Sequence, residues 1–512
     1  AYPSNDVESK GWFPVTPETI ENFSATAYFF GRDLQAGLEG IPIGLIHTSW
    51  GGTKIEAWTS AAALEAENLF VDEIAAVKTS SKDQDKAILA VYKSDHKSWL
   101  ARVDSIANDL NSKNFEALTS SLTDETWSSM DIPTYWELID GFKKYDGLMW
   151  FKRQVNLPDA WAGEELIISL GTVDDHDWTY LNGKLVGQNM ASSKPSEYQI
   201  RPEQFHVGEQ TLAVRVLDVN RRGGLWGRTQ DLFITARDSK DTLWLAGSWA
   251  FKPILNTIEN NLVPLKRPYL HNRPSVLYNA MIAALTPLSI RGVIWYQGES
   301  NGSRAHEYRT SFPLLIRDWR NAWGQGNFPF LYVQLPNWGK RKSKPAEDKW
   351  AELRDAQLQT LSLPNTAMAV TIDIGDERDI HPKNKQEVGR RLALLALNQV
   401  YGQQDVAATG PLFKTFKKKW GKIRVRFDKA TTTLATSDGR EPVGFTIAGE
   451  DRVFHRAEAK IIRQEVVVWS KEVKRPVAVR YAWAANPDCN LTHLSGLPAS
   501  PFKTDDWPDT TE

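Results

Sequence analysis

The chain has 512 residues, a formal net charge of −2 at pH 7, 41% hydrophobic and 24% charged residues, so it is globular and long enough for about three or four domains. Its balanced charge, without a block of Lys or Arg, excludes the electrostatic footprint of a nucleic-acid-binding or anionic-membrane-binding protein, and no apolar run reaches the roughly 18 residues that span a bilayer. The single cysteine, Cys489, excludes an internal disulfide and a CxxC metal site.

The first predicted elements are a helix, a short strand and a loop. Apolar residues at helical spacing predict a helix over residues 23–38, with Ser24 as its N-cap. Residues 41–47 predict a short buried strand of the kind that parallel sheets use, and it leads into the loop SWGGT at residues 49–53. Residues 60–112 are rich in Ala, Glu, Lys and Leu and predict two or three further helices.

The sequence pattern changes near residue 115, and from Trp136 to about Thr235 it is alternating and interrupted by turn residues. The dipeptide Asn182-Gly183 between two strand-like runs predicts a hairpin. Short strands at regular spacing predict a β-sandwich. Asp174, Asp175, His176 and Asp177 could ligate a metal, but their strand–turn context favours a structural or sugar-contacting role, and we expect no metal site.

Helices and apolar strands alternate again up to residue 400, which predicts a parallel sheet flanked by helices. Predicted strands cover residues 292–296, 330–335 and 367–373, and predicted helices cover residues 275–285, 304–323, 346–362 and 383–400. A β pattern follows residue 402. We therefore expect an α/β core in two parts with a β insert between them and a small C-terminal β-domain, with boundaries at 1–115, 116–240, 241–402 and 403–512.

The most informative stretch is DIGDERDIHP at residues 373–382. Asp379 could hold one ring nitrogen of His381 and stabilise the imidazolium, which leaves the other nitrogen free to take a proton from a hydroxyl nucleophile. The competing interpretation is an N-cap cluster, in which Asp379 caps a helix that begins at Pro382.

Three loops follow predicted strands of the α/β part, and ligands bind at such carboxyl ends in open parallel sheets. Besides the Asp379/His381 loop, SWGGT offers bare N–H groups of Gly51 and Gly52, and residues 295–302 offer the amides of Gln297 and Asn301. These groups suit an acyl-transfer site, which needs a nucleophile, a base, an orienting carboxylate and oxyanion donors. Ser300 is a possible nucleophile because residues 298–302 fit G-x-S-x-G.

The motifs SWGGT, WYQGESN at residues 295–301 and DIHP at residues 379–382, in this order, resemble the sialate O-acetylesterase-like branch of the SGNH/GDSL hydrolases. The resemblance extends over about residues 20–500. It implies a three-layer α/β core with a β jelly-roll insert, and a serine esterase that removes acetyl groups from O-acetylated sugars without a metal or cofactor. The implied substrates are acetylated oligosaccharides of plant cell walls, such as xyloglucan, or sialic acids, and the implied location is periplasmic or secreted. Tryptophan, at 21 residues, also favours carbohydrate because its flat face stacks on sugar C–H surfaces.

The resemblance also implies roles for individual residues. His381 would be the general base and Asp379 its orienting acid, with Asp376 a weaker candidate because Arg378 occupies the position where many SGNH enzymes place their Asp. Gly52 would stand in the oxyanion-hole position. Gln297 and Glu299 lie in the loop that carries the oxyanion Asn of other SGNH enzymes, with Asn301 beside them as a further oxyanion or substrate contact.

One family feature is missing from this sequence. The nucleophile of the family sits in a Gly-Gln-Ser-Asn-Met motif after the first strand, and no such motif occurs here. We expect the nucleophilic Ser on an upstream segment or another chain, so that residues 1–512 alone are inactive, with Ser300 as the alternative nucleophile. A non-catalytic glycan-binding protein on an esterase scaffold and a glycosidase that uses Glu299 as an acid stay as alternatives.

Overall fold

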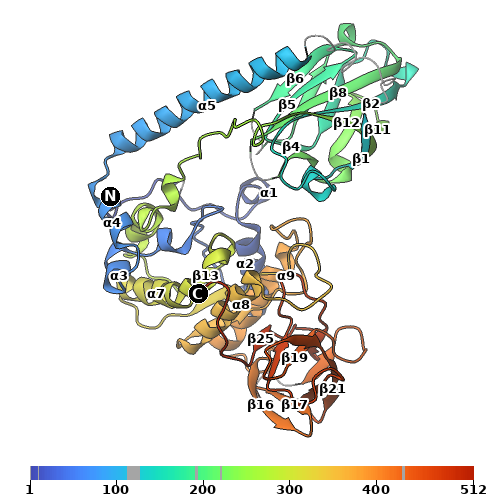
Figure 1. The fold of residues 1–512 in the computed structure, drawn as a ribbon. Coiled ribbons are helices and arrows are strands. Elements are labelled where there is room, and N and C mark those ends of the chain that lie inside the picture. Colours follow the sequence, from blue (N-terminus) through green and yellow to red (C-terminus); the bar gives the residue numbers. More distant parts are fainter. Residues whose placement is uncertain (1, 10, 112–126, 191–193, 220–221, 429–432) are drawn as a thin grey trace. The chain divides into compact units, whose positions relative to one another are not determined.

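The computed structural model describes the chain apart from residues 1, 10, 112–126, 191–193, 220–221 and 429–432 (Figure 1). The described residues form two compact units, one of residues 1–82 with 269–512 and one of residues 83–268. The chain leaves the first unit, builds the second and then returns. This is a mixed α/β protein with several separate sheets and an inserted domain, as the sequence predicts.

The first unit is built on a parallel sheet with the order β13-β14-β15, which confirms the predicted parallel pairing. Its strands are β13 (Val293–Trp295), β14 (Phe330–Val333) and β15 (Thr366–Ala369). Ile294 lies opposite Leu331, and Leu331 lies opposite Ala367. Apolar strands of this kind are buried on both faces because helices cover both sides of the sheet.

Alternate residues of β14 enter two different cores. Tyr332 packs with Phe312 of helix α7, whereas Leu331 packs with Phe30 of α2 and Val388 of α9. Successive side chains of a strand point to opposite faces, so α7 and α8 cover one face of the sheet and α2 and α9 cover the other. Figure 1 shows α2 and α9 side by side.

The helices of the first unit agree with the prediction except that α1 (Pro17–Ile20) was not predicted and one predicted helix is replaced by other turns. They are α1 (Pro17–Ile20), α2 (Ala25–Gly37), α3 (Ala61–Ala66), α4 (Val71–Thr79), α7 (Ala305–Trp323), α8 (Lys349–Gln359) and α9 (Lys385–Leu395). Ser24 caps α2 as predicted, since its hydroxyl accepts from the N–H of Ala27. The helix predicted over 275–285 is instead a π-helical turn, η7 (Tyr278–Ile282), followed by a 3-10 turn, η8 (Ala283–Leu285). Among the described helices, none combines the length and apolar character needed to span a bilayer.

The buried strand predicted over residues 41–47 is wrong. This segment has no assigned strand, and Ile41 and Ile46 are 57% and 42% exposed. In the described part of the chain no strand pairs with it, and β13 pairs with β14 alone. A strand requires a partner for its backbone hydrogen bonds, so an apolar run without a neighbouring strand stays irregular.

The second unit is a β domain with two main sheets and a further two-stranded sheet of β4 and β9. One sheet has the order β1-β12-β2-β8-β5-β6, and the other has the order β11-β10-β3-β7. Asn182 and Gly183, with φ of 46° and 80°, join β5 to β6, which confirms the predicted hairpin. The strands are β1 (Ser128–Ile132), β2 (Gly147–Leu157), β3 (Leu166–Leu170), β4 (Thr172–Asp174), β5 (His176–Leu181), β6 (Lys184–Asn189), β7 (Glu197–Ile200), β8 (Gly208–Asp218), β9 (Gly224–Trp226), β10 (Leu232–Ala236), β11 (Thr242–Trp244) and β12 (Gly247–Asn256).

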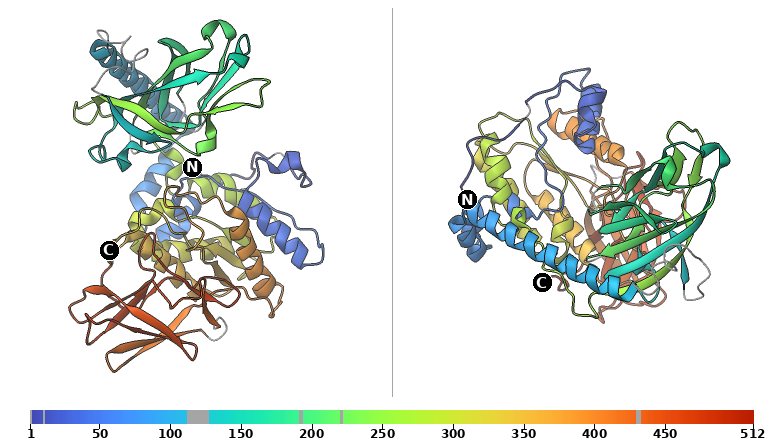
Figure 2. Two further views of the ribbon diagram at one scale, coloured as in Figure 1. Left: turned by 90° about the vertical axis from the view of Figure 1, so that its right-hand side faces the viewer. Right: turned by 90° about the horizontal axis from the view of Figure 1, so that it is seen from above.

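The boundaries expected for this insert need correction. Its end at residue 240 is wrong because β12 pairs with both β1 and β2 inside the larger sheet. The expected start at residue 116 lies outside the described residues. The long helix α5 (Lys82–Asn111) precedes that point but belongs to the second unit, since Val103 and Ala107 pack on Trp150 of β2. In Figure 2 the C-terminal part of α5 meets the β domain, whereas the rest of the helix extends away from it.

The C-terminal part is a small β structure, as predicted, within the same compact unit as the parallel sheet. Its sheets have the orders β16-β17-β22-β21, β20-β19-β23-β25 and β18-β24. Buried Arg354 of α8 joins it to the core, because its guanidinium donates to the carbonyls of Leu335, Pro336, Ala484 and Ala485. The strands are β16 (Phe413–Lys419), β17 (Lys422–Phe427), β18 (Leu434–Thr436), β19 (Phe445–Ala448), β20 (Phe454–Arg456), β21 (Glu458–Ile462), β22 (Glu465–Trp469), β23 (Ala478–Tyr481), β24 (Leu491–His493) and β25 (Phe502–Lys503).

Candidate active site

The imidazole of His381 lies on an exposed loop with the carboxylate of Asp379 beside it. Nδ1 of His381 is 3.5 Å from Oδ1 of Asp379, and the backbone N–H of His381 donates to the same oxygen at 2.9 Å. The His381 side chain is 81% exposed, whereas that of Asp379 is 27% exposed. The carboxylate therefore lies within ion-pair distance of one side of the ring and leaves Nε2 available, as a general base requires.

The competing interpretation, in which Asp379 caps a helix that starts at Pro382, is wrong. Helix α9 begins at Lys385, and its N-cap is Asn384, whose side chain accepts from the N–H of Glu387 at 3.1 Å. Asp379 is therefore free of the capping role and its carboxylate faces the histidine.

Asp376 closes the turn that precedes the histidine. Its Oδ1 accepts from the backbone N–H groups of Arg378 and Asp379, at 2.8 and 3.3 Å. Asp379, and not Asp376, is the carboxylate that contacts His381. Of the two acids that the sequence analysis weighed, the preferred Asp379 is therefore the one beside the imidazole.

Two contacts fix the loop between β15 and His381. Arg391 of α9 donates from both terminal nitrogens to Asp373, at 2.6 and 2.7 Å. The N–H of Gly375 donates to Oδ1 of Asn337 at 2.7 Å, and a Cβ at position 375 would lie 1.8 Å from the carbonyl oxygen of Asn337. Position 375 requires glycine because the two backbones approach this closely.

Glu299 lies within electrostatic range of His381 and Lys385. Burial raises the pKa of Glu299, and the charges of His381 and Lys385 oppose this rise. Burial also lowers the pKa of Lys385, whose ammonium lies 4.9 Å from the ring centre of Tyr296. The loop after β13 and the loop after β15 therefore share one electrostatic environment at the carboxyl edge of the sheet, where open parallel sheets bind ligands.

The amides of Gln297 and Asn301 are buried and engaged within the protein. Nε2 of Gln297 donates to the carbonyl of Thr53 at 3.0 Å and to Oδ1 of Asn301 at 2.8 Å, and its Oε1 accepts from the hydroxyl of Tyr308 at 2.9 Å. Oδ1 of Asn301 also accepts from the N–H of Ile55 at 3.0 Å. These bonds join the loop after β13 to residues 53–55, so both amides position the loops instead of pointing at a ligand.

Gly51 and Gly52 lie at the surface, with open space around their α-carbons. Gly52 has a φ of +70°, a conformation that favours glycine. Its carbonyl accepts from Nδ2 of Asn272 at 3.2 Å, and the neighbouring indole of Trp50 stacks on His271 with ring centres 5.2 Å apart. Within the described residues neither glycine N–H donates a hydrogen bond, so both stay available for the oxyanion role that the resemblance implies.

No serine hydroxyl of the described residues forms a hydrogen bond with the ring of His381. Ser300 is half-buried in the short helix η9 (Glu299–Arg304). Sequence reasoning missed a different pair, His47 and Ser49, whose Nε2 and Oγ are 2.7 Å apart. Partial burial lowers the pKa of His47, and its ring packs edge-on against Phe23 with ring centres 5.2 Å apart. The sequence feature that could have revealed this pair is a His and a Ser two residues apart, just before Gly51-Gly52.

The described residues whose donor atoms could share a metal ion are not those of this site. Among the described residues, two groups of three side chains have donor atoms close enough to share an ion, and neither group contains His381 or Asp379; they are His306, Asp509 and Glu512, and Glu137, Asp146 and Asp218. Buried Asp177, from the acidic run in the insert, accepts hydrogen bonds from the hydroxyls of Thr179 and Tyr198 at 2.9 and 2.6 Å. Its role is structural.

An apolar groove follows the unpaired edge of β13. Its volume is about 440 Å³, and it separates β13 from residues 43–48. The indole N–H of Trp295 in its wall is buried without a hydrogen-bond partner among the described residues. Its walls are apolar on both sides of the sheet plane and include Phe30, Leu34, Ile43, Leu45, Ile294, Trp323 and Tyr401.

Comparison with known proteins finds two matched regions. Residues 266–398 match the family described as carbohydrate esterase, sialic acid-specific acetylesterase, and residues 129–250 match the sugar binding domain of glycosyl hydrolases family 2. The sialate O-acetylesterases of Mus musculus and Homo sapiens are 32% and 38% identical over 266 and 255 residues, 47% and 45% of this chain. The chain spans about half, 49%, of the length of these curated relatives.

A solved structure is also similar. The crystal structure of a carbohydrate acetylesterase from Xanthomonas citri is 29% identical and covers 67% of this chain and 96% of its own, with a TM-score of 0.45. His381, Asp379, Glu299 and Gln297 all lie inside the region that matches the esterase family. By these matches, residues 266–398 are similar to a family of carbohydrate esterases, and about half of the chain is similar to sialate O-acetylesterases.

Proposed function

We propose that this chain supplies the general base, the orienting acid and the substrate-binding loops of a serine-dependent carbohydrate O-acetylesterase with an SGNH-type three-layer core. The observation that carries the proposal is the pair His381–Asp379, with 3.5 Å between Nδ1 and Oδ1 and Nε2 left available, at the carboxyl edge of a parallel sheet. The match of residues 266–398 to a family of acetylesterases supports the same chemistry.

The proposed reaction has two steps. In the first, Nε2 of His381 takes the proton of a serine hydroxyl while the serine oxygen bonds to the acetyl carbonyl carbon. The tetrahedral oxyanion collapses, the bond between the acetyl carbon and the sugar oxygen breaks, and His381 returns the proton to that oxygen. In the second, water repeats the attack on the acetyl-enzyme, which releases acetate and restores the serine. Asp379 stabilises the imidazolium in both steps, and the N–H groups of Gly51 and Gly52 are the proposed oxyanion donors.

The nucleophilic serine is proposed to come from a polypeptide segment outside residues 1–512. The groove along β13 supports this proposal. It exposes the unpaired edge of β13, and its walls are apolar on both sides of the sheet, so a further buried parallel strand would fit there. A strand paired in parallel with β13 would end at the same edge of the sheet as β13 and β15. The residue after such a strand would therefore emerge beside the loops of Glu299 and His381.

The proposed substrates are O-acetylated sialic acids or acetylated plant cell-wall oligosaccharides such as xyloglucan. The names of the curated relatives favour sialic acids, and the match of residues 129–250 to a sugar binding domain fits either class. Because both substrate classes are extracellular glycans, we propose a periplasmic or secreted location.

The test is acetate release from 9-O-acetylated sialic acid and from acetylated xyloglucan oligosaccharides. Two proteins are compared, residues 1–512 alone and the product of the complete reading frame that contains them. We expect acetate only where the additional segment is present. A fluorophosphonate probe, which labels activated serines, should then mark a peptide outside residues 1–512.

Ser300→Ala and Ser49→Ala serve as matched controls, and neither should reduce acetate release more than a few-fold. Activity of residues 1–512 alone that disappears in Ser300→Ala or Ser49→Ala would place the nucleophile inside this sequence. Glycan binding without acetate release by either protein would favour the non-catalytic interpretation. Cleavage of glycosidic bonds without acetate release would favour a glycosidase.

A further inference from the structure

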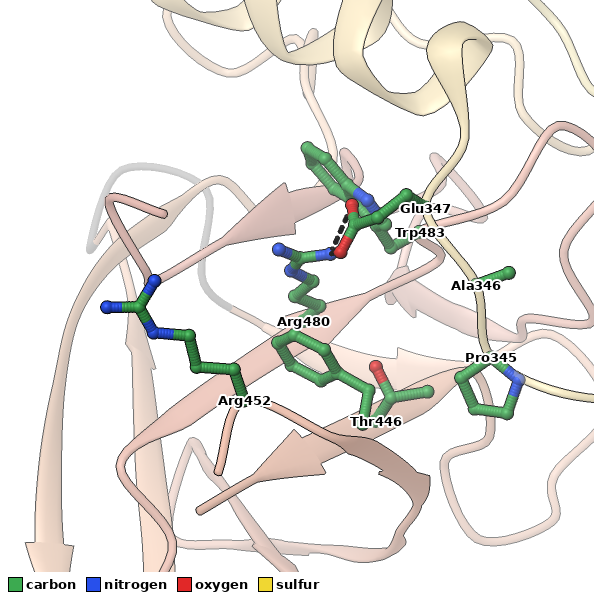
Figure 3. A pocket seen from close by; sticks show the side chains of 8 residues that line it. Pro345, Ala346, Glu347, Thr446, Arg452, Arg480 and Trp483 are labelled. Carbon is green, nitrogen blue, oxygen red and sulfur yellow. Dashed lines mark hydrogen bonds and ion pairs between the residues drawn. The ribbon is translucent and has the colours of Figure 1, made fainter. Parts of the chain in front are cut away.

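A second pocket lies in the C-terminal part, between the segment before α8 and the strands around β23. Its volume is about 210 Å³, below the roughly 300–1,000 Å³ of pockets that enclose drug-sized ligands. Figure 3 shows the ion pair of Glu347 and Arg480 among the lining side chains, with Arg452 on one side and Pro345 and Ala346 on the other. The pocket has the size for one small polar ring.

The carboxylate of Glu347 is held as a preorganised acceptor. Nη1 of Arg480 donates to both of its oxygens, at 2.8 and 2.9 Å. The Arg480 side chain is 3% exposed, whereas that of Glu347 is 40% exposed. A buried guanidinium therefore fixes the carboxylate from behind, and the remaining lone pairs of its oxygens stay open to a ligand hydroxyl.

The charges around the pocket balance. Arg480 also donates from Nε and Nη2 to buried Asp505, at 2.9 and 2.7 Å, so two carboxylates surround this one guanidinium. The second guanidinium is that of Arg452, which is exposed, lies over the ring of Trp507 at 5.5 Å and makes no ion pair with a described carboxylate. Two acids and two bases leave no net charge, which favours a neutral ligand that offers hydroxyls to both Glu347 and Arg452.

The remaining walls suit a ring with C–H faces. Phe454 and Trp483 line the pocket, and the guanidinium of Arg480 lies 4.1 and 4.9 Å from their ring centres. Trp483 is 7% exposed, and its indole N–H is buried without a hydrogen-bond partner among the described residues. Thr446 adds a hydroxyl. Aromatic walls with a fixed carboxylate and a guanidinium are complementary to a pyranose, which has C–H faces and adjacent hydroxyls.

We propose that this pocket binds one neutral sugar residue of a glycan chain. In this arrangement Glu347 accepts from one ring hydroxyl, Arg452 donates to another, and Phe454 and Trp483 contact the ring. The pocket shares no lining residue with the proposed esterase site, so it is a separate glycan-binding site that would hold the polymer during or between deacetylation events. It does not depend on the proposed esterase function.

The experiment is isothermal titration calorimetry of the full chain with neutral oligosaccharides of glucose, xylose, galactose and mannose, and with N-acetylneuraminic acid. We expect at least one neutral oligosaccharide to bind and N-acetylneuraminic acid to bind more weakly. Glu347→Gln and Arg452→Gln should each weaken that binding about tenfold or more, since each removes a charged hydrogen-bond partner. When they are introduced into the product of the complete reading frame, both substitutions should leave acetate release from small acetylated substrates at the rate of the unsubstituted protein.

Arg463→Gln is the matched control, because Arg463 is also an exposed arginine with a positive φ in the same part of the chain but lies outside the pocket. It should bind the sugar like the parent. Arg452→Gln changes an exposed residue, so it tests the site even if Glu347→Gln unfolds. The proposal is overturned if no neutral oligosaccharide binds, if Arg452→Gln binds like Arg463→Gln, or if N-acetylneuraminic acid binds most tightly.

Discussion

Two loops at the carboxyl edge of the parallel sheet carry similar polar residues but use them differently. In the loop after β13, the amides of Gln297 and Asn301 are buried and bonded to other parts of the protein. In the loop after β15, the His381 ring is 81% exposed and is held at one side by Asp379. Polar groups whose hydrogen bonds are satisfied internally shape a site, whereas a group held at one side and open at the other can react.

The sharpest test of this difference is His381→Ala, measured as acetate release by the product of the complete reading frame. We expect a loss of about 10³–10⁴-fold in kcat with an unchanged melting temperature, because the ring is exposed and is the proposed general base. The exposed His206→Ala is the control and should retain full activity. A loss below tenfold in His381→Ala would remove this residue from the catalytic role.

For Asn301→Ala we expect a loss of stability instead of a loss of catalytic rate. Asn301 is fully buried, and its removal leaves the N–H of Ile55 and the amide of Gln297 with unmet hydrogen bonds. Urea unfolding should show a loss of about 2–4 kcal/mol in the free energy of unfolding. If the variant instead keeps its stability and loses kcat more than 100-fold, Asn301 acts in the chemistry and the distinction between the two loops fails.

A smaller effect is expected when the His381 loop is displaced without changing the histidine. In Gly375→Ala the added methyl would lie 1.8 Å from the carbonyl oxygen of Asn337, so the loop must shift. We expect a loss of about 1–3 kcal/mol in unfolding free energy and about 10–100-fold in kcat. Gly302→Ala, where the nearest atom would be 3.4 Å away, should change both by much less. Equal effects of the two substitutions would show that the close approach at Gly375 is not what positions His381.

The smallest expected effect is a pH dependence in the second unit. His176 is buried, and both of its ring nitrogens lack hydrogen-bond partners among the described residues. Burial lowers its pKa, and the nearby charge of Asp175 opposes this shift. The unfolded chain, with an ordinary His pKa of about 6.5, therefore takes up a proton that the folded state resists. Stability from this group is complete above about pH 6.5 and is lost as the pH falls below it.

Urea unfolding at pH 7.5 and at pH 5.0 measures this dependence, with His176→Gln and the exposed His206→Gln compared at both values. The parent and His206→Gln should lose about 1–2 kcal/mol more than His176→Gln between the two pH values. An identical pH dependence in all three proteins would contradict the assignment to His176.

The local sequence pattern was enough to predict several elements of this fold. Helical spacing and a Ser N-cap predicted α2, alternation and Asn182-Gly183 predicted the β5–β6 hairpin, and apolar strands between helices predicted the parallel pairing of β13, β14 and β15. These features depend on residues close in sequence, so the chain carries their signal directly. The spacing of Asp379 and His381 likewise predicted their contact, because two residues in one turn cannot lie far apart.

Other properties depend on partners distant in sequence, and only the tertiary structure decided them. Residues 41–47 look like a strand, but the described residues provide no partner strand for them. The insert extends to β12 because that strand pairs with β1 and β2, which lie about a hundred positions earlier in the chain. Gln297 and Asn301 look like ligand-binding amides until their contacts with residues 53–55 appear. Backbone pairing and hydrogen-bond satisfaction are long-range constraints, which no local pattern can reveal.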